Sequence, residues 1–195
     1  MIDFTAAKEF ILDKLKTGLN PYLYYHCYNH TLDVYHSAIK LAKLEKINKD
    51  EMIILETAAL FHDSGFLLGY NEHEDGSIKF TRKHLPEFGY SDADIETICS
   101  MILATKLPQS PKTILEKILC DADLDYLGRD DFFMIANQLL CEWNINGIPT
   151  TLKKWYHIQV DFLSNNDYFT KSAKNLRIEK KKKNLSQIVE LLTKN

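Results

Sequence analysis

Glycine and proline are scarce in this 195-residue sequence, which holds seven glycines and five prolines. Since these residues punctuate turns, their scarcity disfavours a fold of many short strands and favours long helices. No stretch approaches the roughly 18 apolar residues of a membrane span. The first sixteen residues, MIDFTAAKEFILDKLK, contain acids and lack the cationic start of a signal peptide. We therefore expect a cytoplasmic helical protein with no membrane partner.

Paired cysteines are also missing. The four cysteines, Cys27, Cys99, Cys120 and Cys141, form no C-x-x-C spacing. This pattern excludes the usual cysteine zinc sites and fits a reducing compartment, where buried cysteines behave as small apolar residues.

A strong overall charge is absent, because the formal net charge is only −3. Nucleic acid is therefore not favoured as a partner. The one concentration of basic residues lies between Lys171 and Lys183 and includes the run Lys180–Lys183. That run could bind nucleic acid or polyphosphate, but its position in a long amphipathic segment favours the solvent-facing side of a helix.

Hydrophobic periodicity predicts helices along the whole chain and no strand. We expect an all-α fold with one helical domain over residues 1–195, in which a core of about 20–130 is followed by C-terminal helices over about 130–195. The expected helices are Asp3–Lys16, Asn29–Lys46, Asn48–Phe61, His73–Glu87, Ser91–Thr105, Thr113–Asp121, Asp130–Trp143, Thr150–Leu163 and Asp167–Thr193.

Four polar residues occupy positions where this periodicity calls for apolar ones. His30 begins the inward stripe of the second helix, His62 and Asp63 end the apolar third helix, and Asp121 continues a line of isoleucines in the sixth. A buried carboxylate is costly unless it is paired or binds a metal. Two imidazoles and two carboxylates that converge would suit Mn, Fe, Ni, Zn or Co, and Mg less well.

Each of these residues also has a simpler structural explanation. A single core histidine can hydrogen-bond to the backbone, and an aspartate after a helix can cap the next turn. Asp121 could instead pair with Lys117 or Arg129. The order of the four along the chain, and not any one of them, makes a metal site the favoured interpretation.

That order resembles the HD-domain superfamily of metal-dependent phosphohydrolases. The matching segments are Tyr25–Thr31, Ala58–Gly65 and Ile118–Asp123, within a resemblance over roughly residues 20–130. It implies an HD-type helical bundle that hydrolyses a small nucleotide or phosphomonoester through a metal-activated water. His30, His62, Asp63 and Asp121 would hold the metal, and Asp63 would also orient the water. Asp33 and Asp123 are candidates to support the imidazoles, although a solvated position at the surface is the favoured interpretation for Asp33.

The resemblance leaves several alternatives open. One divalent ion is favoured over two, because His73 and His84 lie eleven residues apart on one expected helix, about 16 Å along its axis. A non-catalytic nucleotide-binding regulatory HD module is the second hypothesis. A stringent-nucleotide pyrophosphohydrolase is disfavoured. Members of that group resemble one another in a Glu-Asp pair closely after the His-Asp pair, whereas in this sequence Ser-Gly-Phe-Leu-Leu follows Asp63. A homodimer through exposed helices stays open.

Two further residues are candidates for the catalytic step. Glu74 starts the fourth helix just beyond the expected metal loop and could act as a general base or touch the substrate; alternatively, it is an acid favoured by the helix dipole. Lys106 follows the fifth helix and could hold a phosphate, although a solvated lysine is the simpler interpretation.

Overall fold

The computed structural model describes residues 1–194, and in these residues the regular structure is entirely helical. The predicted all-α fold is confirmed. The elements are α1 (Phe4–Gly18), α2 (Tyr28–Leu44), α3 (Lys49–Phe61), η1 (Ser64–Leu67), α4 (His73–His84), η2 (Leu85–Phe88), α5 (Asp92–Thr105), α6 (Ile114–Asp123), η3 (Asp125–Gly128), α7 (Phe132–Ile145), α8 (Leu152–Asn165) and α9 (Lys171–Thr193), where η marks a short 3₁₀ helix.

Six of these α-helices, α1, α3, α5, α6, α8 and α9, begin at a side-chain cap that satisfies a free backbone N–H group. The Asn48 side chain accepts from the Glu51 N–H at 2.9 Å. Ser91 and Asp94 form a reciprocal capping box at the start of α5. The fourth helix ends earlier than predicted, at His84, because Pro86 has no N–H to continue the α-helical pattern and the chain tightens into η2.

α3 lies at the centre of the first hydrophobic cluster and packs against α1, α2, α5 and α6. Its last five residues, Thr57–Phe61, are all buried, as expected for a helix that is apolar nearly all round. The predicted inward stripe of α2 is also buried at Val34, Ser37, Ala38 and Leu41. Together these helices hold the end of α3 deep in the molecule.

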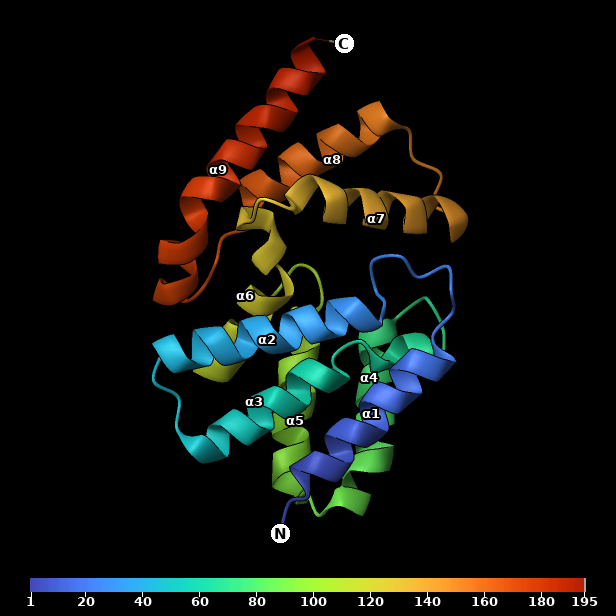
Figure 1. The fold of residues 1–195 in the computed structure, drawn as a ribbon, viewed down its shortest axis with the longest axis vertical. Coiled ribbons are helices and arrows are strands. Elements are labelled where there is room, and N and C mark those ends of the chain that lie inside the picture. The colour runs from blue at the N-terminus through green and yellow to red at the C-terminus, as the bar shows by residue number, and fades with distance from the viewer. Residues whose placement is uncertain (195) are drawn as a thin grey trace.

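The C-terminal helices α7, α8 and α9 gather at the opposite end of the molecule from α1 and α3, and the two chain termini lie at these opposite ends (Figure 1). A second hydrophobic cluster lies here, and its buried members include Phe132, Trp155 and Ile188. The division of the chain into one domain with a core and a C-terminal part stays a prediction.

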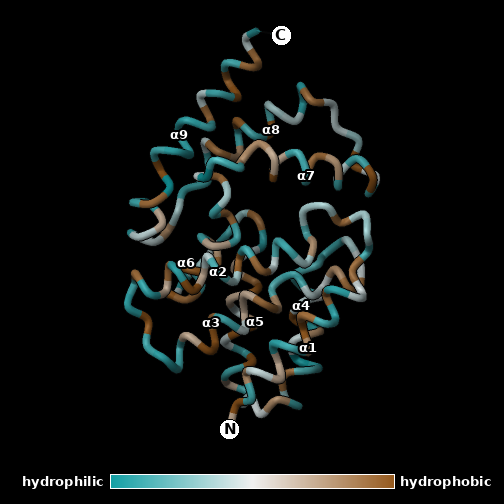
Figure 2. Tube along the Cα trace, viewed as in Figure 1, coloured by the Kyte–Doolittle hydropathy of each residue, from teal (hydrophilic) through white to brown (hydrophobic). Residues whose placement is uncertain are grey.

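The lysine run in α9 differs from its predicted solvent-facing arrangement at one position. Figure 2 shows hydrophilic residues along much of α9. Lys181, however, is buried and donates a hydrogen bond to the Asn166 carbonyl oxygen. Lys180 pairs with Asp130, and Lys182 pairs with Glu179. Lys180 and Lys181 therefore tie the run to other parts of the fold, whereas Lys182 pairs only within its own helix.

Over residues 1–194, no helix has both the length and the apolar character needed to cross a lipid bilayer. The four cysteines are all unpaired.

Candidate metal centre

The His62–Asp63 pair is positioned by a close approach of two backbones. α3 ends at Phe61, and the chain continues through η1 without a left-handed turn at Gly65. A Cβ at Gly65 would lie 1.9 Å from the His73 carbonyl oxygen, so only glycine lets the start of α4 approach the His-Asp turn this closely. The Gly65 N–H donates to Ser77 Oγ at 2.8 Å, which fixes α4 on this turn. The role of Gly65 is therefore this close contact with α4.

Three helix ends bring nitrogen and oxygen donors to one point. His30 comes from α2, His62 from the end of α3, and Asp123 is the last residue of α6. One donor atom from each of the three lies within 4.8 Å of the others. His30 Nε2 lies 3.2 Å from Asp123 Oδ1 and 3.4 Å from His62 Nε2.

Asp63 completes this group from the other side of the imidazoles. Its Oδ2 lies 3.1 Å from His62 Nε2 and 3.4 Å from His30 Nε2. That oxygen is buried and has no hydrogen-bond partner within the described residues. Donor pairs about 3.0–3.5 Å apart are the edges of a coordination shell with metal–ligand bonds of about 2.1 Å. The residues therefore fit a divalent ion, and the unpaired oxygen is explained by one.

The tautomer of His62 supports the same interpretation. Its Nδ1 lies 2.8 Å from the Ala59 carbonyl oxygen, to which the Nδ1–H donates. In the neutral ring this bond directs the Nε2 lone pair toward Asp63 and His30. An outer hydrogen bond of this kind is what orients metal-ligating histidines in proteins.

The charges of the group are strongly coupled. Burial lowers the pKa of His62, but the Asp63 carboxylate outweighs it and raises that pKa to about 9. Burial raises the pKa of Asp63, but the His62 and His26 imidazoles outweigh it and hold that pKa well below its usual range. Before an ion binds, the pair is therefore a carboxylate beside a protonated imidazole, and a metal ion that takes the Nε2 lone pair would release that proton.

Asp121 does not join this group, and the predicted ligand set changes here. Its Oδ1 accepts from the Phe169 N–H at 2.7 Å, and its Oδ2 accepts from the N–H and the hydroxyl of Thr170 at 2.8 and 2.6 Å. It therefore anchors the segment that enters α9. Residues two apart on a helix point about 200° apart, so Asp121 and Asp123 face opposite sides of α6, and Asp123 is the one beside His30.

The remaining predicted residues lie at different distances from the group. Glu74 lines the adjoining cavity, and its Oε1 lies 3.5 Å from His73 Nε2. Lys106 is exposed, pairs with Asp75 at 3.2 Å and is not among the residues that line the cavity. Asp33 pairs with Arg129 at 2.7 Å and so supports neither imidazole.

A histidine that the sequence did not single out lies beside the group. His26 Nδ1 is hydrogen-bonded to Oε1 of Glu142, whose side chain is fully buried, and Oε2 of that carboxylate accepts from the Tyr25 and His26 N–H groups at 2.8 and 3.0 Å. The Phe66 ring stacks on His26 and on His73, with centroids 4.4 and 4.3 Å away. Glu142 in α7 thus fixes His26 across 116 residues of sequence.

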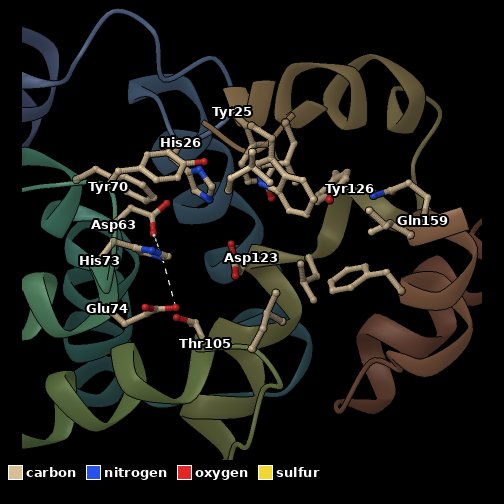
Figure 3. A pocket seen from close by; sticks show the side chains of 18 of the residues that line it. Tyr25, His26, Asp63, Tyr70, His73, Glu74, Thr105, Asp123, Tyr126 and Gln159 are labelled. Atoms are coloured by element: carbon tan, nitrogen blue, oxygen red, sulfur yellow. Dashed lines mark ion pairs between the residues drawn. The ribbon is translucent and has the colours of Figure 1, made fainter. Parts of the chain in front are cut away.

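A cavity of about 320 Å³ opens beside Asp63 and Asp123. Figure 3 shows Asp63, His73 and Glu74 on one side of it and Gln159 on the opposite side, with Asp123 between them. The walls near Asp63 are polar, whereas those from α7 and α8 are mostly aromatic and aliphatic. The cavity therefore joins a site for a charged group to a site for an apolar one.

Comparison with models of protein families identifies the family to which the residues of this site belong. The model of the HD domain matches residues 27–125, which is just over half of the chain. The chain belongs to the HD domain family. The matched segment contains His30, His62, Asp63 and Asp123, and it ends before α7. Membership supports a hydrolase of the metal-dependent kind.

Solved structures share the HD fold over nearly the whole chain. Bacillus subtilis YpgQ is 20% identical with a TM-score of 0.68, and the match covers 98% of this chain and 96% of that one. The structure of YpgQ in complex with ADP is matched at 17% identity and a TM-score of 0.66, covering 98% and 97%. A predicted HD superfamily hydrolase from an uncultured Thermotogales bacterium is 19% identical, with a TM-score of 0.61 and coverage of 97% and 89%. No functionally characterised protein matches by sequence.

Proposed function

We propose that this HD domain protein hydrolyses a small phosphorylated compound, with a nucleotide or phosphomonoester as substrate. The observation that carries the proposal is the buried Asp63 Oδ2, which has no hydrogen-bond partner among residues 1–194, faces two imidazole nitrogens and adjoins the cavity. A buried carboxylate in this setting is most simply stabilised by a metal ion.

His30, His62, Asp63 and Asp123 would hold one divalent ion. Their mixture of imidazole and carboxylate suits Mn, Fe, Ni, Zn or Co better than Mg. When bound, the ion would lower the pKa of a water molecule and offset the negative charge of the phosphoryl oxygens.

Residues of the chain itself would direct the attack. Asp63 lies at the boundary between the donor group and the cavity, where it would orient the attacking water. Glu74 lines the same side and would accept the proton of that water. His73 lies 3.6 Å from Asp63 Oδ1 and 3.5 Å from Glu74 Oε1, between the two carboxylates. It would keep them apart and oriented.

His26 would contact the phosphate. Because its Nδ1 is held by Glu142, its Nε2 is left for the cavity that the ring lines. A hydrogen bond from this nitrogen to a phosphoryl oxygen would position the substrate against Asp63. The exposed Lys106 is given no such role, because its ammonium pairs with Asp75.

One observation favours a nucleotide over a simple phosphomonoester: YpgQ, which shares the fold, was crystallised with ADP. The cavity volume falls within the usual range for small-molecule sites and has room for either kind of compound. A cytoplasmic location, a homodimer and the absence of nucleic-acid binding stay predictions. The alternative function, a nucleotide-binding regulatory module without turnover, is an outcome of the test below.

The test combines metal analysis with a substrate panel. Purified protein should bind one divalent ion per chain and hydrolyse at least one compound from a panel of nucleotides and phosphomonoesters assayed with Mn²⁺, Ni²⁺, Co²⁺ and Mg²⁺. Glu74→Gln should lower turnover by about a hundredfold while the bound metal is unchanged, as expected when a general base is lost. Nucleotide binding without any turnover would establish the regulatory module instead. A chain that binds no divalent ion contradicts the metal centre.

A further inference from the structure

The far half of the cavity is built by helices that the family match does not include. Residues from α7, α8 and the loop between them form this wall, and of those that line the cavity none is charged. They are Leu139, Trp143, Ile148, Trp155, Ile158, Gln159 and Phe162. Three of the seven are aromatic and three are aliphatic, so the wall offers an apolar surface with flat rings against which an uncharged planar group can pack.

Gln159 is out of place in this wall. Its side chain is only 4% exposed, and its Oε1 has no hydrogen-bond partner within the described residues. It lies one turn after Trp155 and one turn before Leu163 on the buried face of α8, where an aliphatic residue would complete the pattern. A buried amide without a partner is costly, so a partner from outside the chain accounts for its presence.

We propose that the α7–α8 half of the cavity is a nucleobase site, in which the Gln159 amide hydrogen-bonds to the edge of the base. This inference rests on the proposed function for the phosphate end only. A glutamine amide offers a donor and an acceptor side by side, and bases present the complementary pair along one edge. Trp143 is partly exposed and packs edge-on against the buried Trp155, with ring centroids 5.1 Å apart, and it provides aromatic surface for stacking.

The competing occupant of an apolar wall is an acyl or other aliphatic group. Such a group would fill the space but leave Gln159 Oε1 unpaired. A base would both stack on the aromatic side chains and hydrogen-bond to the Gln159 amide. Figure 3 places Gln159 across the cavity from Asp63 and His73, so a base at Gln159 would direct the rest of a nucleotide toward the donor group.

The two tryptophans of the sequence both line this wall, so intrinsic fluorescence reports on it directly. The experiment is a fluorescence titration of the full chain, without added metal, with adenosine, guanosine, cytidine and uridine. These probes carry no phosphate and do not need the ion. We expect at least one nucleoside to give a saturable change, and Gln159→Leu to weaken its binding about tenfold or more. Gln138→Leu, at an exposed glutamine of α7, is the matched control and should bind as the wild type does.

A second variant and a second substrate keep the outcomes distinct. Gln159→Met preserves the length of the side chain and replaces the leucine variant if the latter does not fold. No saturable change with any of the four nucleosides, or equal affinity in the wild type and the folded Gln159 variant, overturns the base site. Glycerol phosphate has no base, so its hydrolysis reports on the donor group alone. Nucleoside binding that depends on Gln159, in a protein that hydrolyses no phosphorylated compound, would refute the proposed function and leave the base site standing.

Discussion

The two halves of the cavity differ in the chemistry of their walls and in their origin along the chain. The half around Asp63 comes from the ends of α2, α3 and α6 and the start of α4, and it buries charged groups beside one another. The half around Gln159 comes from α7 and α8 and is almost entirely apolar. The family match covers the first half and stops at residue 125. The family match therefore covers the residues that we propose to hold the metal and direct the water, whereas the wall that we propose to select the rest of the substrate lies outside it, in the C-terminal helices.

The largest effect is expected from removing the charge of Asp63. Asp63→Asn should lower turnover by about a thousandfold or more, because a contribution of several kcal/mol to the transition state is lost. Nucleoside binding measured by tryptophan fluorescence should be unchanged, because the far wall is intact. Steady-state kinetics and the titration check the two halves separately, and a parallel loss of nucleoside binding would show that they are not independent.

Two aspartates on α6 provide a matched pair. Asp123→Asn should weaken metal binding by about a hundredfold, because one of the charged ligands is lost. Asp121→Asn should leave metal stoichiometry unchanged but lower the free energy of unfolding by about 1–3 kcal/mol, because the hydrogen bonds that hold the Phe169–Thr170 backbone are weakened. Calorimetric metal titration and denaturant unfolding distinguish the variants. Loss of metal in Asp121→Asn would restore the original ligand assignment.

Glu142 of α7 hydrogen-bonds to the Tyr25–His26 segment and so connects the two halves of the cavity. Its replacement should lower the free energy of unfolding of the chain. Burial raises the pKa of Glu142, but the bonded His26 imidazole outweighs it and lowers that pKa below its ordinary value of 4.5. The folded form thus binds the proton less tightly than the unfolded form. The resulting stability is present at neutral pH and is lost as the pH falls below about 4.5.

Glu142→Gln should therefore cost about 3 kcal/mol at pH 7 and show a shallower loss of stability between about pH 5 and pH 3 than the wild type. Urea unfolding at a series of pH values measures both effects. Parallel curves for the two proteins would mean that the Glu142–His26 pair does not carry the linkage.

A smaller effect is expected at Trp143. Trp143→Leu should raise KM for the preferred nucleotide about tenfold, which corresponds to the loss of one stacking contact, while kcat changes little. Hydrolysis of glycerol phosphate, assayed in parallel, should be unaffected. A fall in kcat for both substrates would mean that this wall also positions the donor group.

The smallest effect is expected at Lys106. Its pair with Asp75 is exposed, and such pairs contribute little. Lys106→Ala should therefore change kcat/KM by no more than about twofold. A drop of a hundredfold in the same assay would return the lysine to the phosphate-binding role that its position in the sequence suggested.

Hydrophobic periodicity predicted which residues are buried better than it predicted the interaction partners of the buried polar side chains. Helices, the central position of α3 and the inward direction of His62 follow from the spacing of apolar residues. The spacing of apolar residues also predicted correctly that Asp121 is buried. It could not predict the partner, because the sequence pattern is the same whether the carboxylate binds an ion or the backbone at the start of α9. Asp123, less buried and at the end of its helix, leaves no such trace in the pattern.

Glu142 and Gln159 could not be predicted as site residues from the sequence, for a related reason. Each is a polar residue in a helix that is otherwise half exposed, where a polar residue needs no explanation. Only the docking of α7 against the Tyr25–His26 segment, and of α8 against the cavity, shows that they face inward.

One turn of α7 both lines the apolar wall and anchors the Tyr25–His26 backbone, and these two roles tolerate different kinds of mutation. Leu139 and Trp143 shape the apolar wall, and Glu142 beside them holds the Tyr25–His26 backbone. Neither wall residue takes part in the Glu142 hydrogen bonds, so a point substitution at either one can change the wall and leave those bonds in place. An inserted or deleted residue within α7 rotates everything after it by about 100° and removes both contributions at once. We therefore expect descendants of this chain to vary in the identity of the wall residues and to keep the length of this helix.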